Sequence, residues 1–269
     1  MNIAQKIIEA HKLKFGSLPP MQQCSVSGSA LFNADCMDIL PLIPDKSIQL
    51  ILADLPYGTT NLKWDSVLDL NKLWKQYERI IADNGAIILT ASQPFTTVLI
   101  NSNPALFKYE WIWVKDKPSN FALANKMPMK YHENVLVFYK KQPKYNKQME
   151  KRDGGGKKRC KYAVNYENRQ SEHLTLKNGA KFFDMEFKNP SSVQKFSTGR
   201  RQDLIHPTQK PLEMMKYFIA TYSDENDYVL DNTMGSGTTC LAAKELNRKF
   251  IGIEKEPKYY DLAVARVFG

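Results

Sequence analysis

The sequence predicts an α/β fold built on a doubly wound, mostly parallel sheet. Short apolar runs typical of strands alternate with segments whose apolar residues recur at helical spacing, both early and late in the chain. Between these two regions lies a polar, irregular stretch with neither periodicity. We therefore expect one sheet covered by helices, with an insertion at its edge.

The N-terminal region supplies the first group of expected elements. The apolar run at 48–53 is the clearest strand, and residues 67–81 carry apolar side chains at helical spacing. Asn84-Gly85 is expected to end this helix. The other elements expected here are an N-terminal helix, a strand at 31–33, a turn or helix at 37–42, a strand at 86–90, a helix at 95–100 and β-rich runs at 109–114 and 134–139.

The middle of the chain is strongly basic. Residues 140–161 hold ten Lys or Arg residues against two acids, with a Gly triplet inside the stretch, and polar sequence continues to about residue 202. Beyond it the pattern predicts helices at 211–222, 238–246 and 257–267 and strands at 228–230 and 250–253. The expected organisation is an N-terminal lead-in at 1–30, a main domain formed by 31–140 and 203–269, and an insertion at 141–202.

Composition limits the class of protein. The 269 residues are 43% hydrophobic, which allows a sizeable core in one large domain with an insertion, or in two small domains. A net charge of +10 favours a polyanionic partner, with nucleic acid ahead of a membrane. No apolar run approaches the ~20 residues of a membrane span, and the N-terminus has no signal-peptide core.

The four cysteines are scattered along the chain. They form no Cys-x-x-Cys pair and have no His cluster nearby. This spacing predicts neither a zinc site nor a disulfide framework, so we expect no metal. It also fits a reducing, cytoplasmic location.

An acid directly follows the clearest strand. Asp54-Leu55-Pro56-Tyr57 places a carboxylate, a kinked backbone and an aromatic ring at the carboxyl end of that strand. The Asp54 carboxylate and the Leu55 carbonyl, fixed by Pro56, are two acceptors for the hydrogens of an exocyclic amine. The Tyr57 ring can stack on the attached base, which would first be flipped out of a duplex. Taken alone, such a tetrapeptide is more often an ordinary turn.

A second predicted strand end carries a glycine-rich turn, Asp231-Asn-Thr-Met-Gly-Ser-Gly-Thr-Thr239. Gly235 and Gly237 allow a tight turn and a close approach of the backbone to a ligand. Glu254 ends the next strand about 20 residues beyond the first glycine, where a partner for ribose hydroxyls is expected. The pairing suggests a nucleoside-containing cofactor. A nicotinamide-binding turn and a plain strand-to-helix turn are the alternatives, whereas a phosphate loop is disfavoured because no Gly-Lys-Ser/Thr follows.

These two segments resemble the motifs of the DNA amino-methyltransferases that use S-adenosylmethionine (AdoMet). The family's catalytic motif is Asp/Asn/Ser-Pro-Pro-Tyr/Phe, and Leu55 here replaces the first Pro. The leading Asp54 is similar to the adenine-N6 members, whereas cytosine-N4 enzymes more often lead with Ser. The family's cofactor motif resembles Asp-Pro-Phe-x-Gly-Ser-Gly-Thr-Thr, with Asn232 and Thr233 in place of Pro and Phe. The catalytic motif comes first, which is the permuted order of the β group.

Two further segments extend the resemblance over 31–140 and 203–267. The segment around Asp35 and Cys36 is similar to the one near the cofactor adenine, and His206-Pro-Thr-Gln-Lys-Pro211 is similar to the one that closes over the methionine end. The resemblance implies a class I methyltransferase fold with AdoMet as methyl donor. The implied cofactor-binding residues are Asp35, Cys36, Asp54, Thr208, Lys210, Asp231, Met234, Gly235, Ser236, Gly237, Thr238 and Glu254.

The resemblance also implies individual roles. Glu254 would bind the ribose hydroxyls, and Thr208 and Lys210 would contact the methionine carboxylate. Asp35, with its neighbour Cys36, would lie beside the cofactor adenine. The structural alternatives are a helix cap for Asp35 and a polar lead into the following helix for Lys210.

The implied activity is methyl transfer to the exocyclic N6 of adenine in flipped-out DNA, with Asp54, Leu55, Pro56 and Tyr57 as the catalytic residues. Such a reaction needs positioning and hydrogen bonding rather than a metal or a covalent intermediate. The alternatives are cytosine-N4 DNA methylation, RNA or protein-amide methylation, a non-catalytic nucleic-acid-binding module, and a nicotinamide dehydrogenase, for which no hydride-transfer acid–base pair is visible. A restriction–modification partner and a homodimer are left open.

The basic insertion is expected to bind DNA. Its cations, among them Lys157, Lys158, Arg159 and Lys161, are interleaved with tyrosines, a pattern that can follow phosphates and stack on bases. In the family that the chain resembles, this position usually holds the target-recognition region. The alternative is a solvated basic surface loop.

Overall fold

The computed structural model describes residues 2–18, 20–24, 28–58, 67–152, 186–198 and 209–269. The chain divides into two compact units, a main unit formed by 1–146 and 192–269 and a smaller unit formed by 147–191. The expected boundaries were 31–140 with 203–269 for the main domain, and the assignment of the smaller unit to target recognition stays a prediction.

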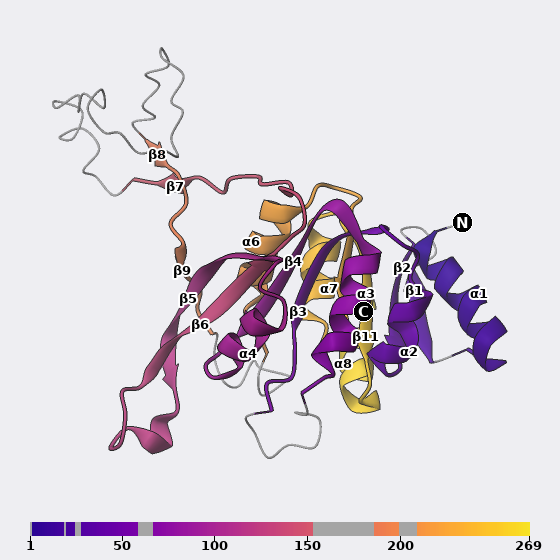
Figure 1. Cartoon of the computed structure of the whole chain (residues 1–269), viewed down its shortest axis with the longest axis horizontal. Helices are drawn as coiled ribbons and strands as arrows, with labels where there is room; N and C mark the ends of the chain where they lie inside the picture. The colour runs from indigo at the N-terminus through magenta and orange to yellow at the C-terminus, as the bar shows by residue number, and fades with distance from the viewer. Residues whose placement is uncertain (1, 19, 25–27, 59–66, 153–185, 199–208) are drawn as a thin grey trace, which may run out of the picture. The chain divides into compact units, whose positions relative to one another are not determined.

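A nine-stranded sheet forms the centre of the main unit in the described residues (Figure 1), with the order β1-β2-β11-β10-β3-β4-β6-β5-β9. The five strands from β2 to β4 in this order are parallel, while β1 and the β5–β6 hairpin pair antiparallel with them. The expected doubly wound, mostly parallel sheet is confirmed. The strands are β1 (Met21–Cys24), β2 (Ser29–Asn33), β3 (Ile48–Asp54), β4 (Ile81–Ala91), β5 (Phe107–Ser119), β6 (Lys130–Phe138), β9 (Val193–Lys195), β10 (Tyr228–Asp231) and β11 (Lys249–Glu254).

Helices cover both faces of this sheet. Buried apolar residues of α1 to α4 belong to one core cluster, and those of α6 to α8 belong to a second. In β3, Ile51 and Ala53 join the first cluster while Leu50 and Leu52 join the second, so this strand is buried on both sides and reads as a continuous apolar run. The helices are α1 (Ile3–Phe15), α2 (Cys36–Ile39), α3 (Leu70–Ile80), α4 (Phe95–Ser102), α6 (Leu212–Tyr222), α7 (Thr238–Glu245) and α8 (Pro257–Phe268), with 3₁₀ turns at η1 (Leu40–Leu42) and η2 (Phe121–Leu123).

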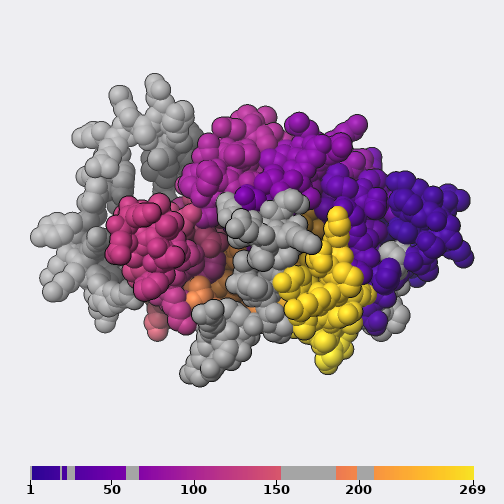
Figure 2. Space-filling view, turned by 90° about the horizontal axis from the view of Figure 1, so that it is seen from below, coloured from indigo at the N-terminus to yellow at the C-terminus, as the bar shows by residue number. Residues whose placement is uncertain are grey.

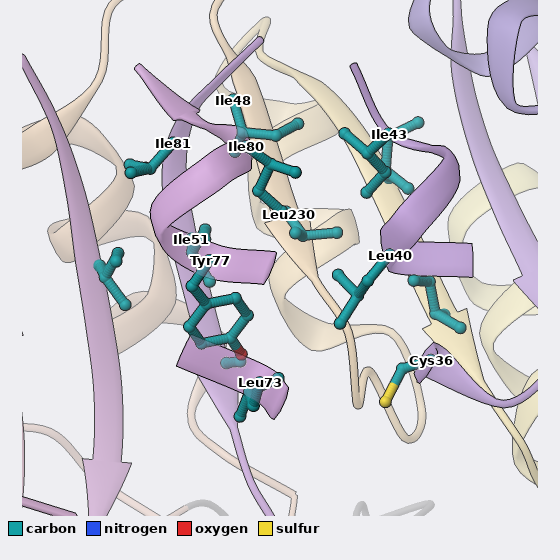
Figure 3. Packing of buried hydrophobic residues seen from close by; sticks show 14 of the residues in the cluster. Cys36, Leu40, Ile43, Ile48, Ile51, Leu73, Tyr77, Ile80, Ile81 and Leu230 are labelled. Atoms are coloured by element: carbon teal, nitrogen blue, oxygen red, sulfur yellow. The ribbon is translucent and has the colours of Figure 1, made fainter. Parts of the chain in front are cut away.

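Helix α3 shows how one face is packed. Figure 3 shows Leu73, Tyr77 and Ile80 on the side of the helix that faces Ile51 of β3 and Leu230 of β10. All five side chains are buried. The three helix residues recur at intervals of three or four, which is the spacing that predicted a helix here.

Both expected ends of this helix were wrong. The helix begins at Leu70 rather than at residue 67, because the Asp69 side chain caps it. It ends at Ile80, and Asn84-Gly85 lies inside β4, where the pairing with β3 shifts register. A Cβ at Gly85 would come within 2.8 Å of the Gln49 carbonyl oxygen, so the glycine serves a close approach of strands and not a helix end.

The N-terminal residues take part in the main unit. Ile3, Ala4 and Ile7 of α1 belong to the first core cluster, and β1 extends the sheet beside β2. None of the helices in the described part of the chain is long and apolar enough to cross a membrane.

The β5–β6 hairpin continues past the body of the sheet (Figure 1). Figure 2 views the main unit from below and shows this hairpin in pink, the N-terminal segments in indigo and α8 in yellow. In the smaller unit, β7 (Glu150–Lys151) pairs antiparallel with β8 (Phe187–Lys188).

Candidate active site

The ends of β3 and β10 form the switch point of the sheet. From β3 the chain passes through α3 to β4 on one side, and from β10 it passes through α7 to β11 on the other. Ligands of open α/β sheets bind outside the carboxyl ends of the strands at such a point. Asp54 ends β3 and Asp231 ends β10. The Thr233 hydroxyl donates to the Asp54 backbone oxygen at 3.0 Å, so the two predicted motifs are in direct contact.

Three side chains donate to the Asp54 carboxylate. The Tyr57 hydroxyl donates to Oδ1 at 2.8 Å, and the Thr90 hydroxyl donates to the same oxygen. The Lys210 ammonium lies 2.6 Å from Oδ2. The Asp54 side chain is only 23% exposed and that of Lys210 8%. Charge-assisted contacts of this kind are short and orient the carboxylate.

Lys210 remains charged despite its burial. Burial opposes the ammonium, but the nearby acidic groups, Asp54 first and Glu133 among them, together with the hydrogen bond to Asp54 outweigh it and raise the pKa of Lys210 well above its ordinary value. The ammonium also lies 5.5 Å from the centre of the Tyr57 ring. In this structure Lys210 therefore contacts Asp54 and Tyr57, and its expected contact with a methionine carboxylate stays a prediction.

The sequence assigned Tyr57 an aromatic face for stacking on a base, and in the structure the residue is partly buried. Its ring stacks on Phe95 with centroids 5.2 Å apart. Burial and the nearby Asp54 charge raise the pKa of Tyr57 well above its usual value, so the hydroxyl remains a donor. Leu55, which lies between Asp54 and Tyr57 in the sequence, is buried and anchors this segment to the core.

The sequence analysis missed three residues at this site. Thr90 lies on β4, and Lys115 and Glu133 lie on the two strands of the β5–β6 hairpin. The Lys115 ammonium is 3.0 Å from Glu133 Oε1, and the Lys210 ammonium is 3.6 Å from Glu133 Oε2. Burial would raise the pKa of Glu133, but Lys210 and Lys115 together lower it. The only signal in the sequence was a charged residue, Glu133, two positions before the apolar run at 135–138.

The glycine-rich turn is fastened by Glu254. Gly235 and Gly237 have φ angles of 51° and 74°, in the left-handed region that favours glycine. A Cβ at Gly237 would also lie 3.0 Å from the Cβ of Ala263. Glu254 Oε2 accepts from the Gly235 amide at 2.9 Å, and Oε1 accepts from the Glu256 amide at 2.8 Å. Burial raises the pKa of Glu254.

Asp231, the acid at the start of the turn, is buried, with 4% of its surface exposed. It accepts a hydrogen bond from the Thr233 amide at 3.1 Å. Burial raises its pKa to about 7, and the charges of Asp54 and Glu254 contribute in the same direction. Asp54, Asp231 and Glu254 are therefore three neighbouring carboxyl groups in different environments.

The remaining residues of the turn are held by structural contacts. The Met234 amide donates to the Ile253 oxygen at 3.0 Å. Arg266 of α8 donates to the Thr238 hydroxyl at 2.9 Å and to the Ser236 backbone oxygen at 3.3 Å. These contacts fix the start of α7, which follows the carboxyl end of β10.

The two departures from the cofactor motif have polar partners. The Tyr77 hydroxyl donates to Asn232 Oδ1, and Thr233 bonds to Asp54 as described above. Where the motif usually carries Pro and Phe, this chain therefore links the turn to α3 and to the end of β3 through hydrogen bonds.

Asp35 and Cys36 lie at the end of β2, next to β11. The Asp35 carboxylate caps α2 and pairs with Lys255 at 3.0 Å. Asn33 donates to the backbone oxygen of Glu254 at 2.8 Å, which ties these two strand ends together. Cys36 is a free thiol, and burial raises its pKa to about 11. The structure thus brings the candidate residues of β2, β11, β10 and β3 to one edge of the sheet.

Some candidate residues lie outside the described ranges. They are Thr208, Lys157, Lys158, Arg159 and Lys161. Within the described ranges, His, Cys, Asp and Glu side chains nowhere gather in threes as a metal site would require.

The chain belongs to the DNA methylase family (N6_N4_Mtase), whose model matches residues 48–265. This confirms the resemblance to DNA amino-methyltransferases. The Type II methyltransferase M1.MboII of Moraxella bovis is 29% identical over 257 residues, which cover 87% of this chain and 94% of the relative. The Type II methyltransferase M.BglII of Bacillus subtilis is 28% identical over 256 residues, covering 87% of this chain and 67% of the relative.

Solved structures share the fold. The M1.HpyAVI–SAM complex is 24% identical with a TM-score of 0.58, and the match covers 88% of this chain and 97% of that one. The PvuII DNA methyltransferase (cytosine-N4-specific) is 17% identical with a TM-score of 0.62, covering 88% and 85% of the two chains. The expected class I methyltransferase fold is confirmed.

Proposed function

We propose that this protein transfers a methyl group from AdoMet to the exocyclic N6 of adenine in a flipped-out base of DNA. The observation that carries the proposal is the Asp54 carboxylate, oriented by three donors at the switch point and bonded through its backbone to the glycine-rich turn. Family membership supports DNA as the substrate class.

AdoMet is the methyl donor. The turn at 233–237 presents backbone to the methionine and ribose part of the cofactor, and Glu254 supplies acceptors for the ribose hydroxyls. Asp35 and Cys36, at the neighbouring strand end, flank the cofactor adenine. A solved structure with the same fold, M1.HpyAVI, is a complex with SAM, which supports this assignment.

The transfer is an in-line displacement. The amine nitrogen forms a bond to the methyl carbon as the bond from that carbon to sulfur breaks and leaves its electron pair on sulfur, and the nitrogen then releases one proton to solvent water. Asp54 and the Leu55 carbonyl accept the amine hydrogens, and Tyr57 stacks on the base. The chain contributes mainly orientation, which is a large part of the rate gain in such reactions.

The choice of adenine over cytosine rests on the leading acid of the motif, Asp54. The same pair of acceptors holds a cytosine N4 amine as well, so cytosine-N4 methylation is the alternative outcome of the test.

The Type II relatives support a site-specific enzyme of a restriction–modification pair. The cations at 157–161 are proposed to bind DNA phosphates, and their neutralisation should flatten the salt dependence of binding.

The test is a transfer assay with methyl-labelled AdoMet and separate DNA, RNA and protein substrates. After digestion, mass spectrometry should find N6-methyladenine in DNA, and single-molecule sequencing of DNA from expressing cells should give the flanking sequence. N4-methylcytosine would move the activity to the other amine. Label in RNA or protein but not in DNA would overturn the proposal.

A further inference from the structure

Lys210 lies between two buried carboxylates. Its ammonium is 2.6 Å from Asp54 Oδ2 and 3.6 Å from Glu133 Oε2. Oε2 of Glu133 is buried and accepts no hydrogen bond from the described residues, while Oε1 is occupied by Lys115 at 3.0 Å. A second acceptor for the Lys210 ammonium therefore lies only about half an ångström beyond hydrogen-bond distance.

The first acceptor is the one that the target amine needs. Oδ1 of Asp54 already accepts from Tyr57 and Thr90, which fills both of its lone pairs. The amine is left with Oδ2, where Lys210 already takes one of the two lone pairs. Moreover, the amine nitrogen becomes positively charged as it gains the methyl group, so an ammonium fixed at Oδ2 would repel the transition state.

We propose that Glu133 is a positioning residue for methyl transfer, which draws Lys210 away from Asp54 when the target amine arrives. The inference rests on the proposed function. In the free enzyme Lys210 holds Asp54 in place, and in the substrate complex it moves to Glu133 Oε2 and leaves Oδ2 to the amine. Lys115, itself 6% exposed and bonded also to Ser119 at 3.0 Å, keeps Glu133 from following.

Charge balance favours such an exchange. Asp54, Lys210, Glu133 and Lys115 form an alternating row of two carboxylates and two ammonium groups. Because Lys210 already pairs with both carboxylates, a shift of less than about one ångström changes which of them accepts its hydrogen bond but not the total charge of the row. The move therefore avoids leaving an isolated buried charge, which would be costly.

The first test is Glu133→Gln, which keeps the size of the side chain but removes its charge. Lys210 then has Asp54 as its only strong acceptor in the row and remains on Oδ2. We expect kcat at saturating AdoMet to fall by at least about tenfold. A loss of this size lies within the range of interaction energies measured between residues in contact. The Kd for AdoMet should change by less than about threefold, since the turn is not altered.

Two double variants separate positioning from simple charge balance. Glu133→Gln with Lys210→Met, and Glu133→Gln with Lys115→Met, each remove one cation and one anion from the row. Only the first frees Asp54 Oδ2. We expect kcat to recover at least about fivefold over Glu133→Gln in the first double variant and not in the second.

The measurements are single-turnover transfer at saturating AdoMet and thermal melting of each variant. If Glu133→Gln does not fold, the two double variants are compared directly, and the one without Lys210 must be faster. Equal rates in the two double variants, or full activity of Glu133→Gln, would overturn the inference. Absence of transfer to DNA by the unaltered protein would instead refute the proposed function, so the two failures are distinct.

Discussion

The ammonium of Lys210 lies 2.6 Å from Oδ2 of Asp54, although the two residues are 156 positions apart in the chain. This pair ties the segment before α6 to the carboxyl end of β3. The bond from Thr233 to the Asp54 backbone ties the glycine-rich turn to the same point. Asp54 is thus the residue at which three separate motif segments meet.

Asp54→Ala should remove methyl transfer while leaving AdoMet binding in place. The substitution deletes the acceptor for the target amine but none of the contacts that fasten the turn at Gly235. We expect kcat to fall by at least about 10²- to 10³-fold and the Kd for AdoMet to change by less than about threefold. Labelled-methyl transfer and calorimetry would measure the two quantities. Asp54→Asn, which keeps one acceptor oxygen, should lie between the wild type and Ala, and substantial turnover by the Ala variant would contradict the assignment.

Tyr57 should act through its ring more than through its hydroxyl. Tyr57→Phe loses the hydrogen bond to Asp54 but keeps the stacking face, so we expect a loss in kcat of about fivefold to tenfold. Tyr57→Ala also loses the surface on which the base stacks, which is worth about 1–3 kcal/mol per base, and should be slower by a further factor of about ten or more. A fluorescent base analogue at the target position would report flipping directly. Equal losses in the two variants would show that the hydroxyl, and not the ring, matters.

The sheet and the two motif segments were predictable because their signals are local. The apolar run ending at Ala53 marks a strand buried on both sides, and the acid that follows it has to lie at the edge of the sheet. The glycines at 235 and 237 predict a turn, and both adopt the left-handed backbone conformation that favours glycine. Each of these signals fits within a few consecutive residues.

The other half of the Asp54 environment was not predictable, because it comes from long-range pairing. Thr90 reaches Asp54 because β3 and β4 pair in register, with Asp54 directly opposite Thr90. Glu133 reaches Lys210 because β6, the second strand of the β5–β6 hairpin, pairs with β4. A single sequence does not give strand register across such distances, so neither residue could be assigned a partner.

Asp231 should make the stability of the fold depend on pH. Its pKa rises from 3.8 to about 7 because it is buried, so the native state keeps its proton to higher pH than the unfolded chain does. Stability is therefore unaffected below about pH 4, falls as pH rises from about 4 to 7, and stays reduced above that. Asp231→Asn mimics the protonated acid and keeps an acceptor for Thr233, so it should stabilise the protein at pH 8 by about 2–4 kcal/mol and much less at pH 4.5. Urea unfolding at the two pH values measures this, and an equal effect at both would contradict the shift.

Glu254→Gln should weaken AdoMet binding more than it slows transfer. Glutamine keeps one oxygen for the Gly235 amide but removes the charged acceptor that we assign to the ribose hydroxyls. Hydrogen bonds to a charged group contribute about 1.5–3 kcal/mol, so the Kd for AdoMet should rise by about tenfold to a hundredfold, with kcat at saturation reduced by less than about threefold. Glu256→Gln is the matched control, because it makes the same charge change two residues away and leaves the backbone amide that bonds to Glu254 in place. Calorimetric titration should show less than about twofold change in this control, and a similar loss in both variants would mean that the local charge, rather than contact with the ribose, sets the affinity.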